Sequence, residues 1–198
     1  MQKLFKSFSK IIETPFFTLE EAKSDSQKNT HSYYRITGNN SVIALILDEE
    51  DNFIIIKQYR QSLEQETLEI PAGSIENGEE PFQAIRREIA EETNYQCNLI
   101  PLGNHYRLMM NRTNIKEYLF FGMQPKEIKN IKKEEGIKVI KIPREKLFEY
   151  AVTGKFQQIA AIAIFHLTSS VIGIDITKAS YKLIEQRFLK KFESFNNE

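Results

Sequence analysis

The chain has 198 residues, a formal net charge of zero at pH 7 and an apolar share of 41%. This length suits one domain with a small N-terminal addition, and the apolar share is enough for a buried core. The balanced charge excludes a general basic field for nucleic acid or for an anionic membrane. The single cysteine, Cys97, excludes an intramolecular disulfide framework and is typical of a protein from a reducing cytoplasm.

Neither a signal peptide nor a membrane span is expected from the apolar runs. The first ten residues contain no long apolar run of the kind found in signal peptides. The longest apolar run of the chain, residues 159–167, is shorter than the ~20 residues that cross a bilayer. Cys97 lies among mixed apolar and polar residues, which favours a buried strand thiol over a nucleophile. The histidines His31, His105 and His166 are scattered, so packed or exposed side chains are a better interpretation than ligands.

Residues 1–38 are predicted to form an N-terminal β-rich extension. A basic and aromatic stretch, 3–17, precedes a polar loop or hairpin tip at 21–30, and residues 32–36 favour a strand. Strands of this kind are able to pair with the main domain or with a second subunit. We expect the main domain to occupy residues 39–198.

The main domain begins with two predicted strands, 42–47 and 53–59, joined by a turn. The first strand is continuously apolar, so we expect it to be central and buried on both faces. The second ends in the polar, aromatic and cationic triplet Gln58-Tyr59-Arg60, where a ligand can be met. A short strand at 68–70 follows, ended by Pro71-Ala72-Gly73.

A helix is predicted to begin near Pro81, because proline lacks an N–H that would be unpaired in the first turn. Its core stripe consists of Phe82, Ile85 and Ile89. Asn94 is placed to end the helix, because asparagine tolerates the left-handed conformation of a C-terminal cap.

Three carboxylates of this helix, Glu88, Glu91 and Glu92, recur at i, i+3 and i+4 on a face beside the core stripe. Like charges at this spacing repel one another. A solvated acidic face is one interpretation. The other is a site for a divalent cation such as Mg²⁺ or Mn²⁺, which prefers hard oxygen ligands.

The remaining elements alternate between strands and helices. Strands are predicted at 97–107, 117–123 and 137–142, with loops at 108–114 and 124–136, and helices at 144–153, 156–174 and 178–195. This order, with one helix between strands and three after them, predicts an α+β fold or an α/β/α sandwich.

The stretch from Gly73 to Tyr95 resembles the signature of the Nudix family, G-x5-E-x7-R-E-u-x-E-E-x-G-u. Gly73, Glu79 and the run R-E-I-A-E-E at 87–92 occupy its fixed positions. The one departure is Asn94 in place of the second glycine, and both residue types tolerate a positive φ. The resemblance implies a mixed β-sheet between helices and hydrolysis of a nucleoside diphosphate linked to another moiety.

The resemblance also implies roles for the residues of the signature. Glu88 and Glu92 would be the principal Mg²⁺ ligands, with Mn²⁺ as the alternative ion, Glu91 beside them for a second ion and the carbonyl of Ala72 as a backbone ligand. Such ions neutralise a diphosphate and activate a water. Glu79 matches the position that supports the metal ligands, and Arg87 is expected to orient the carboxylates by charge-assisted hydrogen bonds.

A narrower resemblance concerns the substrate. Q-Y-R at 58–60 followed by E-I-P-A-G at 69–73 is similar to the branch of the family that cleaves ADP-ribose and other nucleoside diphosphate-sugars. Arg60 is then expected to meet a phosphate or a base, and Glu69 to accept hydrogen bonds from a base or ribose. Tyr59 belongs to the same candidate binding set, although packing of Tyr59 and a plain surface charge at Arg60 are the alternative.

The general base of this branch is a glutamate on the loop before the last core strand. E-E-G-I-K-V at 134–139 occupies that place, and alignment on I-K-V favours Glu135, with Glu134 a close second. The alternative is a solvated charged loop, since Lys132 and Lys133 precede the two glutamates. The adjoining glycine suits a loop that moves on substrate binding.

One departure leaves the substrate open. No proline lies between Leu102 and Met123, where ADP-ribose enzymes usually carry one. Arg107 and Arg112 of this stretch are either ligands of a phosphate or sugar, or surface charges. GDP-mannose, dinucleoside polyphosphates and oxidised nucleotides are therefore alternative substrates. A non-hydrolytic sensor is disfavoured, because this chain keeps the carboxylates and its tail leaves no room for a winged-helix module.

Dimerisation is a further expectation from the resemblance, because members of this branch exchange N-terminal strands so that both subunits build each pocket. The aromatic residues of the extension would supply the interface, and they are Phe5, Phe8, Phe16, Phe17, Tyr33 and Tyr34.

Overall fold

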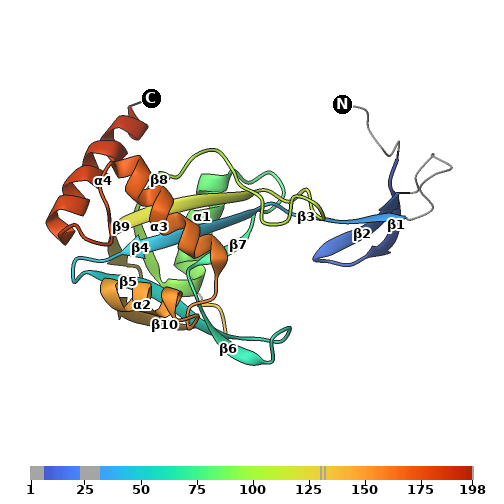
Figure 1. Ribbon diagram of the computed structural model, residues 1–198, viewed down its shortest axis with the longest axis horizontal. Coiled ribbons are helices and arrows are strands. Elements are labelled where there is room, and N and C mark those ends of the chain that lie inside the picture. The colour runs from blue at the N-terminus through green and yellow to red at the C-terminus, as the bar shows by residue number, and fades with distance from the viewer. Residues whose placement is uncertain (1–6, 23–31, 130, 132, 198) are drawn as a thin grey trace.

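The computed structural model describes residues 7–22, 32–129, 131 and 133–197. Its first sheet has three antiparallel strands in the order β1 (Ser9–Glu13), β2 (Phe17–Ala22) and β3 (Tyr33–Gly38). This sheet projects from the rest of the molecule, to which β3 connects it (Figure 1). These three strands lie within the segment predicted to be β-rich. Phe5, His31 and residues 23–30 of the predicted hairpin tip lie outside the described residues.

The second sheet has seven strands and forms the body of the protein. Five follow the order β10-β5-β4-β9-β8, while β6 pairs with β5 and β7 pairs with β4. The β4–β9 pair is parallel and the others are antiparallel, so the sheet is mixed. The strands are β4 (Ser41–Leu47), β5 (Asn52–Arg60), β6 (Gln65–Glu69), β7 (Ala72–Ser74), β8 (Tyr95–Pro101), β9 (Glu117–Glu127) and β10 (Lys138–Pro143).

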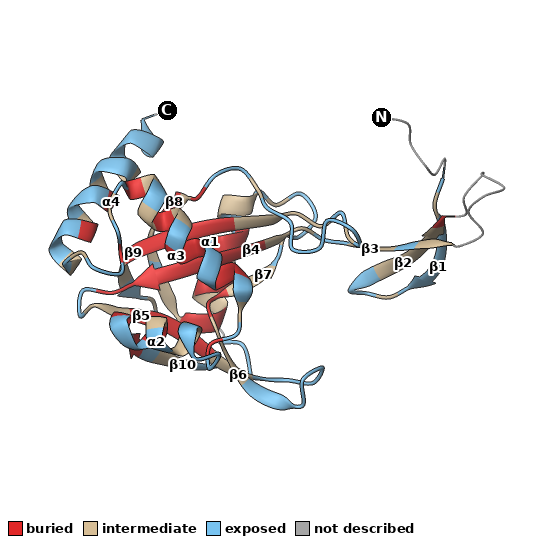
Figure 2. Ribbon diagram, viewed as in Figure 1, coloured by how far each residue is buried: buried red, intermediate tan, exposed pale blue. Residues whose placement is uncertain are grey.

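Helices cover both faces of this sheet, which confirms the predicted α/β/α arrangement. Helix α1 (Pro81–Thr93) lies on one face, and α2 (Arg144–Val152), α3 (Ile159–Ile172) and α4 (Tyr181–Asn196) pack on the other (Figure 1). Alternate residues of β4 enter the two cores, with Leu45 on the three-helix side and Ala44 on the α1 side. The buried residues accordingly concentrate on the central strands, as expected for β4 (Figure 2).

Several boundaries differ from the sequence prediction, among them those of β8, β9 and α3. Strand β8 ends at Pro101, because the chain turns at Gly103 with φ 96°. Strand β9 continues to Glu127 through a stretch that its charged composition marked as a loop, because this end pairs with the first residues of β8. Helix α3 begins at Ile159, after a link in which Phe156 is buried against the core. Within the described parts of the chain, no helix is long and apolar enough to cross a membrane.

Candidate functional site

Helix α1 presents its acidic residues at the border between the helix and β7. The helix begins after Glu80, whose backbone N–H donates to the Gln83 side chain at 3.1 Å. It ends at Asn94, which adopts φ 60° and confirms the predicted left-handed cap. Since Ile85 and Ile89 are buried against the sheet, the adjoining face with Glu88 and Glu92 is directed along the sheet toward β7.

Gly73 explains why the signature pairs a glycine with a glutamate. A Cβ atom at Gly73 would lie 2.1 Å from the carboxyl carbon of Glu88, far inside van der Waals contact. Strand β7 is held in this position by its pairing with β4, where Gly73 lies opposite Val42. A side chain at residue 73 would therefore displace the Glu88 carboxylate from this border, and glycine leaves the carboxylate in place.

Arg87 joins four acceptors around this border. Its Nε and Nη2 donate to Glu79 at 3.0 and 3.1 Å, and Nη2 also donates to the Ser74 carbonyl at 2.9 Å. Its Nη1 donates to Glu88 at 2.8 Å and to Glu91 at 3.1 Å. These bonds raise the pKa of Arg87 and orient the carboxylates, which is the geometry expected for this residue. We call Glu79, Glu88, Glu91 and Glu92 the acidic cluster.

Glu92 is the most deeply placed member of the acidic cluster. It is 4% exposed, and one of its oxygens accepts the backbone N–H of Ala72 at 3.0 Å. Burial raises its pKa to about 8, opposed by the Ala72 hydrogen bond and assisted by the charges of Glu88, Glu134 and Glu69. Burial also raises the pKa of Glu88. The site thus concentrates negative charge where water cannot fully solvate it.

This arrangement fits a divalent cation by its donor chemistry. The carboxylates of the acidic cluster lie close together, and two of them, those of Glu88 and Glu92, are buried and have raised pKa values. Carboxylate oxygens are hard ligands, and a bound cation would relieve the repulsion between them. No three His, Cys, Asp or Glu side chains already form a metal cluster in the described ranges. Arg87 holds Glu88 and Glu91, while the Ala72 N–H holds Glu92, so side chains would have to turn toward an ion.

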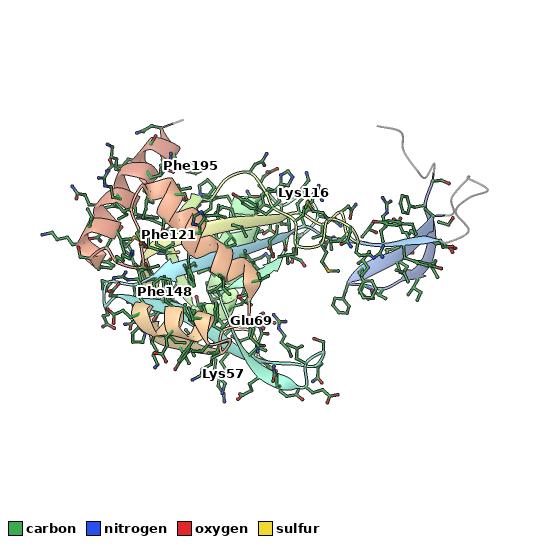
Figure 3. The ribbon with its side chains drawn as sticks, viewed as in Figure 1. Lys57, Glu69, Lys116, Phe121, Phe148 and Phe195 are labelled. Atoms are coloured by element: carbon green, nitrogen blue, oxygen red, sulfur yellow. The ribbon has the colours of Figure 1, made fainter. Side chains whose placement is uncertain are left out.

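Two of the residues expected to contact substrate, Arg60 and Glu69, bind each other. Arg60 of β5 donates from Nε and Nη2 to both oxygens of Glu69, at 2.7 and 2.6 Å, and Thr67 donates to Glu69 at 2.6 Å. Burial alone would raise the pKa of Glu69, but the Arg60 and Thr67 bonds bring it below its ordinary value. We call this arrangement the Arg60–Glu69 pair. Figure 3 shows Glu69 near one end of α3.

A hollow of about 810 Å³ adjoins the Arg60–Glu69 pair. Its walls come from β5, β6, β10 and the link between α2 and α3, and they combine apolar residues with polar tips. Leu68 and Ile140 contribute apolar surface, whereas Lys155 and Gln158 contribute polar groups. Tyr59 does not line this hollow and is 52% exposed on the outside of β5.

The loop before β10 approaches the acidic cluster through Glu134. Its backbone N–H donates to the Glu91 carbonyl at 3.0 Å, and a small hollow is lined by Glu91, Lys133, Glu134 and Glu135. The charge of Glu134 raises the pKa values of both Glu88 and Glu92. Glu135, the residue favoured by sequence alignment, is not among the largest influences on these two pKa values. Lys132 lies outside the described residues.

The stretch with Arg107 and Arg112 lies elsewhere. Arg107 donates to the Asn114 carbonyl of its own loop. The Arg112 carbonyl accepts the N–H of Ile36 in β3 at 2.7 Å, and its guanidinium lies 5.2 Å from the Tyr33 ring centre. These contacts bring the loop to the projecting sheet. The structure therefore does not bring Arg107 together with the Arg60–Glu69 pair.

Two residues near the site escaped prediction. Thr67 hydrogen bonds Glu69 from two positions away, and Gln158 accepts the N–H of Ile70 from 88 residues away. The alternation of β6 offers a weak signal for Thr67, but no local pattern indicates the partner of Gln158. Cys97 matches its interpretation as a structural thiol, because burial raises its pKa to about 12.

Comparison with known proteins gives partial but consistent matches. A 57-residue segment is 40% identical to the methanol dehydrogenase activator of Bacillus methanolicus, covering 29% of this chain and 31% of that protein. A 55-residue segment is 46% identical to the ADP-ribose pyrophosphatase of Bacillus subtilis, covering 28% and 30%. A 43-residue segment is 49% identical to the ADP-sugar pyrophosphatase of Mus musculus, covering 22% and 20%. The matches thus span less than a third of each curated relative.

The whole fold has a counterpart among solved structures. The crystal structure of an ADP compounds hydrolase superposes with a TM-score of 0.70, covering 85% of this chain and 93% of that one. Its 18% sequence identity supports the fold alone. Residues 38–161, more than half of the chain, match the NUDIX domain family. The fold and the family match together confirm the resemblance of the 73–95 stretch, and the chain belongs to the NUDIX domain family.

Proposed function

We propose that this protein hydrolyses the diphosphate bond of a nucleoside diphosphate-sugar, cleaving ADP-ribose to AMP and ribose 5-phosphate, with Mg²⁺ as cofactor and Mn²⁺ as its substitute. The observation that carries this proposal is the adjacency of two features. The acidic cluster has two buried members, Glu88 and Glu92, and Glu88 lies against Gly73. The Arg60–Glu69 pair with its hollow lies close enough for the charge of Glu69 to raise the pKa of Glu92.

The acidic cluster would hold the cofactor. Glu88 and Glu92 are the principal ligands, the carbonyl of Ala72 is the backbone ligand, and the more exposed Glu91 serves a second ion. A bound divalent cation neutralises the diphosphate and lowers the pKa of a water near phosphorus. Arg87 keeps the carboxylates oriented through its bonds to Glu79, Glu88 and Glu91, and it does not contact the substrate.

The Arg60–Glu69 pair would open when substrate binds. The Arg60 guanidinium is then free to take a phosphate in a planar, two-point contact, and Glu69 accepts hydrogen bonds from hydroxyl or amino groups. The hollow has the size and mixed polarity of a small-ligand site, and it would take the part of the substrate beyond the diphosphate. Tyr59, beside Arg60 but outside the hollow, is retained as a candidate contact.

We assign the general base to Glu134. Its backbone is bonded to Glu91, and its charge acts on Glu88 and Glu92, so it lies within electrostatic reach of the reacting region. The carboxylate would accept a proton from the attacking water. Glu135 is the alternative in the same loop, and Gly136, with φ 84°, gives that loop a hinge.

A homodimer completes the proposal. The described part of the extension, which ends at Gly38, carries large apolar side chains in solvent, including Phe16 at 85% exposed and Ile12 at 51%. Projecting apolar strands of this kind are suited to pairing with a second copy. We also place the protein in the cytoplasm, where the lone Cys97 stays reduced.

The test is a hydrolysis screen with and without Mg²⁺ over ADP-ribose, GDP-mannose, other nucleotide-sugars and dinucleoside polyphosphates. Metal-dependent release of AMP from ADP-ribose is the expected result. Cleavage of another member of the panel instead would reassign the substrate. Equal turnover by wild type and Glu92→Gln would show that the acidic cluster is not the catalytic site.

A further inference from the structure

The chain changes its strand partner in the middle of the candidate site. Glu69, the last residue of β6, is paired with β5, and Ala72, the first residue of β7, is paired with β4. Ile70 and Pro71 lie between and belong to neither ladder, yet both are buried. Pro71 has no N–H, and its carbonyl accepts the N–H of Ala44 at 2.9 Å.

This crossover leaves the N–H of Ile70 as a donor that no strand can satisfy. A buried backbone N–H without a partner costs about as much as a lost hydrogen bond. The partner is the Gln158 side chain, whose Oε1 lies 2.9 Å from the Ile70 nitrogen. The next N–H, that of Ala72, donates to Glu92. Two side chains, one from each helical layer, therefore hold the crossover from opposite faces of the sheet.

Gln158 is itself held in place by the start of α3. It is the N-cap of that helix, and its backbone carbonyl accepts the N–H groups of Ala161 and Ile162 at 3.1 and 3.3 Å. Phe156, two residues earlier, is fully buried. The Gln158 side chain therefore starts from a fixed point of the three-helix layer, and its hydrogen bond holds Ile70 at a set distance from that layer.

We propose that Gln158 is a positioning residue of the active site, which sets the place of the crossover and so of Glu69 on one side and the Ala72 carbonyl on the other. The inference rests on the proposed function, because it uses the roles of Glu69 and Ala72 in binding substrate and metal. One side chain thus couples the substrate side of the site to the metal side. A misplacement of about 1 Å in such groups is enough to cost ~10²-fold in rate.

The test compares three variants under conditions where each is folded. Gln158→Leu keeps the size of the side chain but removes the acceptor, and Gln158→Glu restores an acceptor oxygen. Ser169→Ala is the matched control, because its hydroxyl likewise accepts a backbone N–H, that of Ile176 at 3.1 Å, from within α3 but away from the site. Thermal unfolding, steady-state kinetics with ADP-ribose across a Mg²⁺ titration, and amide hydrogen exchange at Ile70 and Ala72 are measured for each.

Gln158→Leu is expected to raise both KM and the Mg²⁺ concentration for half-maximal rate by about tenfold. It should also speed exchange at the Ala72 amide, which Gln158 does not touch. Gln158→Glu should recover most of the kinetic loss. Ser169→Ala should lower the unfolding temperature by a similar amount while its KM, Mg²⁺ requirement and Ala72 exchange stay at wild-type values.

Wild-type kinetics and unchanged Ala72 exchange in Gln158→Leu would overturn the positioning role, whatever its unfolding temperature. Equal kinetic losses in Gln158→Leu and Ser169→Ala would also overturn it, because the effect would then follow general helix stability. If the wild-type protein cleaves no nucleotide-sugar, the proposed function fails, and exchange at Ala72 still decides whether Gln158 holds the crossover.

Discussion

The acidic cluster and the Arg60–Glu69 pair belong to one candidate site, but they are built in different ways. Every side chain of the acidic cluster comes from residues 79–92, on one helix and the turn before it, and Arg87 links three of them directly. The Arg60–Glu69 pair joins two strands, and the chain next to it is held by Gln158 from a distant helix. The acidic cluster is thus local in sequence, whereas the support next to the Arg60–Glu69 pair comes from a distant part of the chain.

This difference bears on which changes elsewhere in the fold affect each part of the candidate site. Local spacing on a helix fixes which carboxylates share a face, so that grouping does not depend on contacts with distant segments. The hollow beside the Arg60–Glu69 pair has walls from β5, β6, β10 and the link between α2 and α3, so its shape is sensitive to that link. Substitutions in the acidic cluster and in the Arg60–Glu69 pair should therefore have different kinds of effect on the kinetics, as well as effects of different size.

The largest effect is expected at the loop that joins the two sides. Glu134→Gln should lower kcat by about 10²- to 10⁴-fold with little change in KM, because it removes a general base and leaves the binding groups in place. Glu135→Gln is the matched control and should retain most of the wild-type kcat. Steady-state kinetics at saturating Mg²⁺ checks both. The reverse pattern would move the base to Glu135.

Gly73→Ala probes the local side of the comparison. A Cβ lying 2.1 Å from the Glu88 carboxyl must push Glu88 or β7 away, which should reduce metal-dependent activity by about 10- to 100-fold. Overpacking should also lower the free energy of unfolding by about 1–3 kcal/mol. Gly78→Ala is the control, because Gly78 has φ 83° but no atom within 4 Å of an added Cβ. It should lose stability and keep its activity when folded.

Arg60→Ala probes the side that depends on tertiary structure. It removes a phosphate contact from the substrate but leaves the acidic cluster intact, so KM should rise about tenfold while kcat changes little. The control is Arg86→Ala. Arg86 is exposed beside Arg87 on α1, and it lines a separate hollow with β8 and β9. A large fall in kcat for Arg60→Ala would place Arg60 in the chemical step rather than in binding.

The smallest effect concerns the pH dependence of stability in metal-free protein. Burial raises the pKa of Glu92 to about 8, so the folded state holds its proton more tightly than the unfolded state does. The stability contributed by this protonation is complete below the unfolded pKa and is lost as the pH rises through 8. Chemical denaturation between pH 5 and 9 with a chelator present should show this decline. Glu92→Gln should flatten it, and an equal decline in that variant would exclude Glu92 as the cause.

Much of the fold was accessible from the sequence because its signals are periodic or local. The continuous apolar run of β4 predicted a strand buried on both faces, and the core stripe of α1 predicted the face that packs on the sheet. The end of β9 was not accessible, because its Lys- and Glu-rich residues become a strand only by pairing with β8. The start of α3 was placed too early for a similar reason, since Phe156 packs into the core before the helix begins.

The acidic cluster follows from the order of residues along the chain. A fixed spacing on a helix after a glycine turn places Glu88 and Glu92 together in any fold that forms the helix, and Asn94 ends it. Contacts between distant segments bring the charge of Glu134 close to Glu92, place Arg107 in another region and bring Gln158 to the crossover. The acidic cluster was predictable because side chains three and four residues apart share one face of a helix. The partner of a buried N–H is chosen by packing, which can bring it from any distance along the chain.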